Sequence, residues 1–278
     1  MKVVKATHAG ACYGVRRALD MALVAAEGGE GASTLGPLIH NPLVVADLAE
    51  RGIRAVDGPD AVDHGAVIIR SHGVTPEVRH AVEARSLEVI DATCPHVARA
   101  QKAAADLARR CEHVVVVGEA GHPEVEGLVA YAREAGGDVV VAGGPEDISD
   151  SLRGSVGVVV QTTQTREALE SVVKGLKERG IDPEVQDTVC FATRQRQEAA
   201  ASLAGEVDAI VVIGGRNSSN TTRLADICAA ACPRTHHVET PDEIDDDWFT
   251  GCTVIGVTAG ASTPEEHIDA VVARLEAL

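Results

Sequence analysis

The sequence predicts an α/β protein built from three small units, each of parallel strands and helices. Short aliphatic runs alternate with amphipathic stretches along the whole chain. Continuous aliphatic strands that alternate with helices are typical of parallel sheets covered on both faces. In addition, three junctions that each place a cysteine just before a helical pattern recur about one third of the chain apart, which indicates a degenerate threefold repeat of one α/β unit.

The predicted strands are runs of valine, isoleucine and alanine bounded by glycine or polar residues. The predicted helices between them include 95–110 and 194–207, where apolar residues recur at helical spacing. The strand candidates are AVIIR (66–70), HVVVVG (113–118), DVVVAG (138–143), VGVVVQ (156–161), AIVVIGG (209–215) and TVIGVTAG (253–260).

The cysteine junctions set the predicted boundaries of the units. Unit 1 is predicted over 13–94, unit 2 over 95–190 and unit 3 over 191–278, with 1–12 packing on unit 3. No long stretch of proline, glycine and serine separates these ranges, so we expect the units to pack closely together. The arrangement expected from three such units is a pseudo-threefold one around a common centre.

Composition limits the classes of partner. The chain has 278 residues, of which 45% are hydrophobic and only 2% aromatic, so small aliphatic side chains must build the core. Its net charge of −17 repels nucleic acid and anionic membrane, and neither is expected as a partner. The first residues lack the apolar core of a signal peptide, and 18 apolar residues nowhere run together, so a cytoplasmic location is expected.

Three of the seven cysteines are metal-ligand candidates. Cys12, Cys94 and Cys190 each stand just before a helical pattern, where the positive end of the helix dipole favours the thiolate that ligates metals. Three thiolates suit a 4Fe–4S cluster with one iron left open, or zinc with an open fourth position. The other cysteines are interpreted as small apolar residues: Cys111, Cys228, Cys232 and Cys252.

Three histidines occupy similar turns after strand-like segments. They are His40 in LIHNP, His72 in RSHGVTPE and His122 in GHPEVEG. In α/β proteins ligands bind beyond the carboxyl ends of the strands, so these turns are candidate binding loops. The last turn also contains Glu124, which either starts the next helix or acts as an acid at the site.

Hydroxyl and amide side chains occupy three further loops. GGRNSSNTTRL and TAGASTPEEH lie between a strand and a helix, where neutral donors at the helix N-terminus form an anion site that suits a diphosphate. A capping box explains the second loop equally well. The candidates from these loops and from QTTQT are Ser218, Ser219, Asn220, Ser262, Thr162 and Thr163.

Taken together and in order, these motifs resemble a known enzyme family. The match runs through HAGACYGVRRAL, GPLIHNP, RSHGV, DATCP, GHPEVEG, QTTQT, CFATRQRQEA, GGRNSSNTTRL and GVTAGAS. The chain resembles the 4-hydroxy-3-methylbut-2-enyl diphosphate reductase family, the last enzyme of the methylerythritol phosphate pathway of isoprenoid biosynthesis. The resemblance covers essentially the whole chain.

The resemblance implies a trefoil-like arrangement of three α/β units around a central 4Fe–4S cluster. It implies that Cys12, Cys94 and Cys190 are the cluster ligands and that Glu124, assisted by Thr162 and His122, delivers protons. Of the two threonines, Thr162 is favoured for the closer role. The implied substrate-binding residues are His40, His72, His122, Thr162, Thr163, Ser218, Ser219, Asn220 and Ser262.

The activity implied is reductive dehydroxylation of an allylic diphosphate to isopentenyl and dimethylallyl diphosphate. Neither a G-x-G-x-x-G fingerprint nor a Walker loop is present, so electrons are expected from a ferredoxin or flavodoxin. Two alternatives remain open from the residues. One is a zinc hydrolase with three cysteine ligands and Glu124 as base, and the other is a non-enzymatic iron–sulfur redox sensor or diphosphate-binding module.

Overall fold

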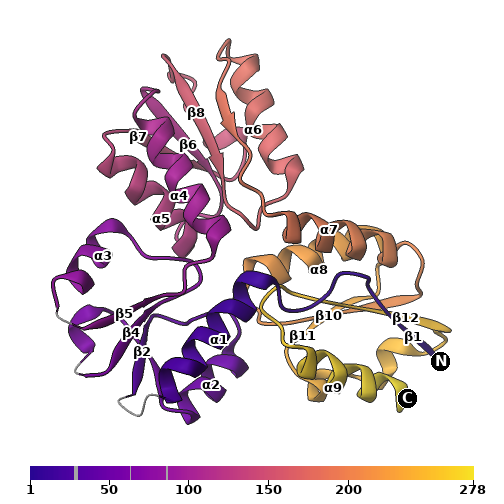
Figure 1. The fold of residues 1–278 in the computed structure, drawn as a ribbon. Coiled ribbons are helices and arrows are strands. Elements are labelled where there is room, and N and C mark those ends of the chain that lie inside the picture. The colour runs from indigo at the N-terminus through magenta and orange to yellow at the C-terminus, as the bar shows by residue number, and fades with distance from the viewer. Residues whose placement is uncertain (28–30, 63, 86) are drawn as a thin grey trace. The chain divides into compact units, whose positions relative to one another are not determined.

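The computed structural model describes residues 1–27, 31–62, 64–85 and 87–278. In these residues the chain forms three four-stranded sheets, and all the strand pairs in them are parallel (Figure 1). Helices alternate with the strands along the sequence. The predicted α/β class with parallel sheets is therefore confirmed.

The first sheet has the strand order β3-β2-β4-β5. Of its two inner strands, β4 is an aliphatic run and β2 is not, and its outer strands carry charged residues. Its strands and intervening helices are β2 Ala32–Leu35, α2 Pro42–Glu50, β3 Ile53–Val56, β4 Ala66–Ile69, α3 Pro76–Glu83 and β5 Glu88–Asp91, with a 3₁₀ turn, η1, at Pro59–Ala61.

The second sheet has the order β7-β6-β8-β9. Its inner strands are buried at every residue except His113, as expected for valine runs covered on both faces. Its elements are β6 His113–Val117, α5 Pro123–Glu134, β7 Asp138–Ala142, η2 Pro145–Asp147, β8 Val156–Val160, α6 Arg166–Glu178 and β9 Glu184–Gln186.

The third sheet joins the two ends of the chain. Its order is β1-β12-β10-β11, and Figure 1 shows the indigo strand β1 beside the yellow strand β12. Its elements are β1 Lys2–Lys5, β10 Ala209–Ile213, α8 Ser219–Ala231, β11 Thr235–Val238, η3 Pro241–Glu243, η4 Asp246–Phe249, β12 Val254–Ala259 and α9 Glu265–Glu276.

One topology is repeated in all three sheets. The first two read strand, helix, strand, 3₁₀ turn, strand, helix, strand, and the third has the same spatial order with its last strand supplied by the N-terminus. A further helix follows the last strand of each repeat. These helices are α1 Tyr13–Glu27, α4 Pro95–Ala108 and α7 Phe191–Ala204.

Alternate residues of each inner strand face different helices. In the second sheet, Val114 and Val116 pack against α4 and α5, whereas Val115 and Val117 pack against α6. This period of two is the reason that an uninterrupted valine run is needed at β6. The core of the third sheet is similar, and Cys228 and Cys232 belong to it as small apolar residues.

The chain separates into two compact units. The first consists of Met1–Arg16, Ile39–Val44 and Phe191–Leu278 and holds the third sheet, and the second consists of Arg17–Leu38 and Val45–Cys190 and holds the other two sheets.

The six predicted aliphatic runs all form strands, but the remaining strands do not stand out in the sequence. Five of these, β1, β3, β5, β9 and β11, are sheet edges of three or four residues. An edge strand is covered less completely, so it carries residues such as Glu88 and Glu184 in place of an aliphatic run. The sixth, β2, is an inner strand of sequence ASTL.

Across the parts of the chain that the structure describes, none of the helices combines the length and the apolarity that a bilayer span requires.

Candidate active site

Each of the three candidate ligand cysteines stands at the start of the helix that follows an edge strand. Cys94 is the N-cap residue of α4, with Pro95 at the first helical position, and Cys12 and Cys190 directly precede α1 and α7. None of the three forms a disulfide, and all are of intermediate exposure. They therefore combine partial access with the positive end of a helix dipole.

The backbone of each cysteine is fixed by the same hydrogen bond. Its amide N–H donates to the carbonyl oxygen two residues beyond the end of the neighbouring inner strand: Cys12 to Ala261 at 3.1 Å, Cys94 to Ser71 at 3.0 Å and Cys190 to Thr162 at 3.0 Å. The three thiols thus occupy equivalent positions of the repeat. These bonds involve only backbone atoms. They fix the position of each cysteine in the repeat, and the thiol takes no part in them.

Cys12 belongs to the first compact unit, and Cys94 and Cys190 belong to the second. In the described residues no group of three or more histidine, cysteine, aspartate or glutamate side chains is arranged to hold a metal ion. The ligand set predicted from the sequence therefore stays a prediction.

The second unit contains a buried carboxyl group at the start of α5. Glu124 is only 1% exposed, its Oε1 accepts from the backbone N–H of Thr162 at 2.6 Å, and its Oε2 accepts from the Thr162 hydroxyl at 2.9 Å. Burial raises the pKa of Glu124 to about 7, and the two Thr162 hydrogen bonds oppose that rise. At neutral pH the group is therefore poised to give up a proton.

The strand register brings this pair together. Val117 at the end of β6 pairs with Val160 at the end of β8, so the residues that follow these strands leave the sheet side by side. Gln161 continues the alignment by donating its backbone N–H to the Val117 carbonyl at 2.8 Å. Thr162 is the next residue, and it meets the helix that begins at Pro123.

His122 is the N-cap residue of the same helix. Its Nδ1 accepts from the backbone N–H of Glu124 at 3.1 Å, so the neutral ring carries its proton on Nε2. The ring of His72, from the loop after β4, lies edge-on to that of His122 with the centroids 5.9 Å apart. The second unit therefore gathers two histidines, Glu124 and Thr162 in one region.

Thr163 is held by a glutamine that the sequence analysis did not select. Gln161 is fully buried, its Nε2 donates to the Thr163 hydroxyl at 3.0 Å, and its Oε1 accepts from the backbone N–H of Glu119 at 3.1 Å. Gln161 thereby links the loop after β8 to the loop after β6. The first glutamine of the QTTQT motif was the available signal, since a polar residue directly after a buried strand needs a partner.

The first unit holds the neutral donors. Ser218 caps α8 and accepts from the backbone N–H of Thr221 at 3.3 Å, which leaves its hydroxyl hydrogen for another acceptor. Asn220 is 5% exposed, and neither its amide nitrogen nor its amide oxygen has a hydrogen-bond partner. A buried amide without a hydrogen bond is energetically costly, so this side chain is suited to binding a polar ligand.

Ser262 and His40 lie together in the same unit. The Ser262 hydroxyl donates to the backbone carbonyl of His40 at 3.0 Å, and the side chain of Asn41 donates to the Ser262 carbonyl at 3.0 Å. Asn41 also caps α2 through the backbone N–H groups of Leu43 and Val44. Asn41 is a positioning residue that the sequence analysis passed over, although its place before a proline marks a helix start.

A close backbone approach shapes these loops. Thr221 is fully buried under Gly214 and Gly260, and a Cβ at Gly260 would overlap the Thr221 hydroxyl. Glycine is therefore required at position 260, where the loop with Ser262 comes against α8.

Most of the predicted site residues occupy equivalent positions of the repeat. The loops after β2, β6 and β10 begin with glycine, and their fifth residues are His40, His122 and Ser218. Their seventh residues are Pro42, Glu124 and Asn220. The third residues of the loops after β4, β8 and β12 are His72, Thr163 and Ser262.

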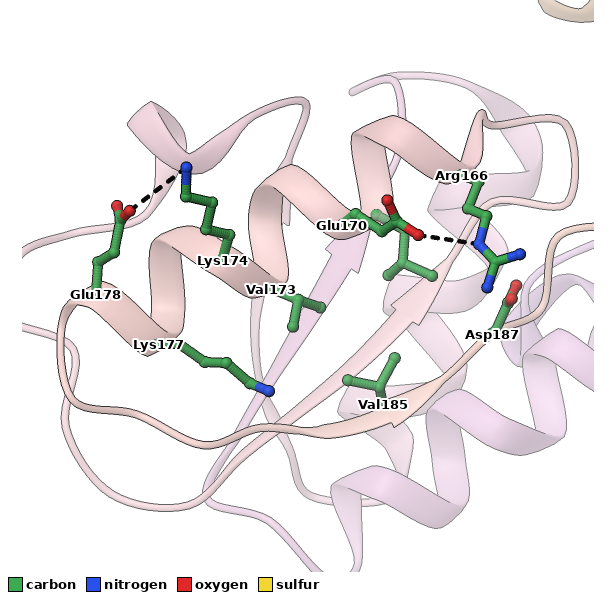
Figure 2. A pocket seen from close by; sticks show the side chains of 9 residues that line it. Arg166, Glu170, Val173, Lys174, Lys177, Glu178, Val185 and Asp187 are labelled. Carbon is green, nitrogen blue, oxygen red and sulfur yellow. Dashed lines mark hydrogen bonds and ion pairs between the residues drawn. The ribbon is translucent and has the colours of Figure 1, made fainter.

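A groove that is separate from these loops lies between α6 and β9. It has a volume of about 700 Å³, and its apolar floor is formed by Leu169, Val173 and Val185. Figure 2 shows Arg166 beside Glu170 and Lys174 beside Glu178 along its rim, with N–O distances of 3.0 and 3.8 Å. None of the predicted site residues lines it.

Comparison with known proteins identifies the family. A family model described as LytB protein matches residues 3–276. The chain belongs to the LytB family. The 4-hydroxy-3-methylbut-2-enyl diphosphate reductase of Citrifermentans bemidjiense is 50% identical to this LytB chain over 100% of the chain and 98% of the relative. The enzyme of the same name from Geobacter sulfurreducens is 48% identical over 99% of the chain and 97% of the relative.

Solved structures agree with this assignment. A structure of (E)-4-hydroxy-3-methyl-but-2-enyl diphosphate reductase, described as the terminal enzyme of the non-mevalonate pathway, is 41% identical and has a TM-score of 0.73 with complete coverage of both chains. The reductase from Plasmodium falciparum is 24% identical, with a TM-score of 0.90 over 98% of this chain and 87% of that chain, which shows a shared fold. The resemblance seen in the sequence is confirmed, and this LytB chain is a member of a reductase family.

Proposed function

We propose that the chain reduces (E)-4-hydroxy-3-methylbut-2-enyl diphosphate to isopentenyl diphosphate and dimethylallyl diphosphate, the last step of the methylerythritol phosphate pathway. The C–O bond of the allylic alcohol breaks and a C–H bond forms. Two electrons and two protons are consumed, and the oxygen leaves as water. The observation that carries the proposal is the buried Glu124–Thr162 pair in a chain about 50% identical to reductases of that name over its full length.

Glu124 is the proton donor in this proposal. Its pKa of about 7 keeps a large fraction of the carboxyl protonated at neutral pH, and its burial keeps bulk water away from the proton. Thr162 orients both carboxyl oxygens, through its backbone N–H and its hydroxyl, and we assign it the place nearest to the substrate hydroxyl. His122 can donate from Nε2, because its Nδ1 is occupied as an acceptor.

We propose that Cys12, Cys94 and Cys190 hold a 4Fe–4S cluster. The donor set fits the group, because each thiol stands at a helix N-terminus, forms no disulfide and occupies the same position of the repeat. When bound, such a cluster supplies the redox and Lewis-acid chemistry that side chains lack. The protein's part is to offer the thiolates, keep the proton donor buried and bind the substrate.

The diphosphate is the part of the substrate that the neutral donors suit. Ser218, Ser219 and Asn220 stand at the start of α8, where backbone N–H groups and the helix dipole favour an anion. The Asn220 amide is buried without a partner and is available for a phosphate oxygen. We assign the remaining contacts to His40, His72, Thr163 and Ser262.

The electron donor and the location belong to the same proposal. We infer that a ferredoxin or flavodoxin delivers the electrons singly, because the sequence has no fingerprint for a nucleotide reductant. A cytoplasmic location suits the seven cysteines, none of which forms a disulfide, because a reducing compartment keeps thiols reduced. We also retain 13–94, 95–190 and 191–278 with 1–12 as the three structural repeats.

The test is anaerobic turnover of the hydroxylated diphosphate with dithionite and methyl viologen as the reductant. Formation of isopentenyl and dimethylallyl diphosphate together with one water per substrate supports the proposal. Metal analysis of the same preparation separates the remaining alternatives: iron with sulfide is expected, whereas zinc and hydrolytic release of phosphate would contradict it. Binding of the diphosphate without product would identify a binding module instead.

A further inference from the structure

The two most exposed aromatic side chains of the protein stand beside the candidate cluster ligands. The chain has five aromatic residues, and all lie in the described parts. Tyr13 directly follows Cys12 and is 63% exposed, and Phe191 directly follows Cys190 and is 67% exposed. The other three, Tyr131, Trp248 and Phe249, are buried or half-buried. Exposure of scarce aromatic side chains at such positions is typical of an interaction surface.

The helices that begin with these residues share a charge pattern. Each has an arginine at its fourth residue, Arg16 in α1 and Arg194 in α7, which a helix places on the same face as its first residue. Neither helix has a carboxylate before its eighth residue, Asp20 or Glu198. In a chain with a net charge of −17, this is a local reversal of sign.

The two helix starts are parts of one compact unit and are joined by hydrogen bonds. Arg196 of α7 is 8% exposed and donates from Nε and Nη2 to the carbonyl of Gly10, at 3.0 and 2.6 Å. Gly10 lies two residues before Cys12 and has a φ of +80°. A Cβ added at this position would overlap the side chain of Ile268. The loop that leads into α1 is therefore tied to the second turn of α7.

The groove between α6 and β9 is the main competitor for a docking role, but its charges are compensated. Arg166 and Lys174 each pair with a glutamate four residues on, and Lys177 pairs with Asp182 at 3.7 Å. Such pairs cancel the local field (Figure 2). An acidic partner would gain little by binding there.

We propose that Tyr13, Arg16 and Phe191, here called the aromatic patch, form the docking surface for the protein that supplies electrons. The partner is a small redox protein with carboxylates around its own flavin or iron–sulfur centre. This proposal rests on the proposed function. An acidic partner is repelled by most of this surface and is attracted to the first two turns of α1 and α7, whose charged side chains are all arginines. Apolar contact with the two aromatic rings then holds it one residue away from Cys12 and Cys190.

Each docking event transfers one electron, and the partner leaves oxidised. Two events are needed for each substrate, because breaking the C–O bond consumes two electrons and two protons. The patch takes no part in proton transfer or substrate binding. Its loss should therefore affect only turnover that depends on the protein donor.

The test compares two reductants on the anaerobically purified holoenzyme. Tyr13→Ser, Phe191→Ser and Arg16→Glu are assayed with reduced ferredoxin or flavodoxin, and again with dithionite and methyl viologen. We expect the KM for the protein donor to rise about tenfold or more in each aromatic variant, as for the central residues of an interface. The rate with the small reductant should not change. The matched control is Val24→Ser, which alters a 68% exposed side chain farther along the same helix α1.

The outcomes separate the two proposals. An unchanged KM for both protein donors in the three patch variants overturns the docking surface while the reductase function stands. Loss of the rate with the small reductant in these variants also overturns it, since the residues would then act on the site itself. If the unmodified enzyme fails to reduce the substrate with any donor, the proposed function falls and the docking proposal falls with it.

Discussion

The loops after β6 and β10 occupy the same position of the repeat and differ in their chemistry. At the seventh residue of each loop, one carries Glu124 and the other Asn220, both almost fully buried at the start of a helix. Glu124 has two hydrogen bonds from Thr162, whereas the Asn220 amide has no partner in the protein. One scaffold position thus holds a buried acid in one unit and, in the other, a buried amide without a partner, which we assign to the diphosphate.

The difference follows from what lies opposite each loop. Two residues that follow β8 form hydrogen bonds with the segment after β6. Gln161 accepts from the backbone N–H of Glu119, and Thr162 donates its backbone N–H to Glu124. The corresponding loop after β12 begins with Gly260 and Ala261, which have no polar side chains and leave room for Thr221. A carboxyl group at Asn220 would lack the donors that Glu124 has. The comparison therefore predicts unequal effects for substitutions at equivalent positions.

The largest effect on activity is expected for the three cysteines that occupy the same position in all three repeats. Cys12→Ser, Cys94→Ser and Cys190→Ser should each lose bound iron and abolish turnover, irrespective of the compact unit that carries the cysteine. Iron and sulfide content, visible absorption and the reductase rate measure this. Cys111→Ser is the control, because burial raises the pKa of that thiol and we assign it no metal. Full iron content in any of the three variants removes that cysteine from the ligand set.

Glu124→Gln should lower kcat by about 10²- to 10⁴-fold, the usual contribution of a positioned acid, with little change in KM. Glutamine keeps the shape and can still pair with Thr162, but it cannot give up a proton. The wild-type rate should also fall as pH rises above about 7, because Glu124 then loses the proton that it donates. Steady-state kinetics across pH check both points, and a variant with normal kcat and intact cluster contradicts the assignment.

The free energy of unfolding should also depend on whether Glu124 is protonated. The pKa of Glu124 is raised from 4.5 in the unfolded chain to about 7 when folded, so the folded state holds the proton more tightly. The free energy of unfolding should therefore fall as pH rises from 4.5 to 7, by about 3 kcal/mol from this group. Denaturant unfolding of the wild type and of Glu124→Gln across this range isolates the effect. Equal pH dependence in the two proteins would contradict it.

The smallest effect on activity is expected at Asn220, which holds in the first compact unit the position that Glu124 holds in the second. Asn220→Asp places a carboxylate where we assign the diphosphate, so KM should rise about tenfold or more through like-charge repulsion, with a smaller change in kcat. Asn217→Asp makes the same change in charge at an exposed residue of the same loop and serves as the control. Equal kinetics for the two variants would remove Asn220 from the binding site.

Apart from β2, the inner strands are readable in the sequence because burial on both faces requires aliphatic runs, as in HVVVV at β6. Apart from β7, the edge strands are not, since strands such as β5 and β9 are short and contain glutamates that face solvent. The start of α7 was placed at residue 194 and lies at Phe191, because the first turn is not amphipathic and only the cysteine junction marks it. Helix starts in general depend on capping contacts that a periodic pattern does not contain.

The motifs selected the site residues, but their partners came from the fold. Glu124 was a candidate acid from its turn, yet its bonds to Thr162, 38 residues on, depend on the pairing of Val117 with Val160. Gln161 and Asn41 were overlooked for the same reason. Both side chains act through hydrogen bonds to other segments of the chain. Composition does not indicate such long-range bonds.

The amino-acid sequence by itself determined the class of fold, the threefold recurrence of the cysteine junctions and the residue types available for chemistry. These depend on local order: aliphatic runs, loop residues and their spacing. Only the tertiary structure decided which side chains share hydrogen bonds and which are buried, and hence that Glu124 has a pKa of about 7 while the buried Asn220 amide has no partner. The physical reason is that a carboxyl group's affinity for its proton is set by the water it loses and the donors it meets, and both come from distant parts of the chain.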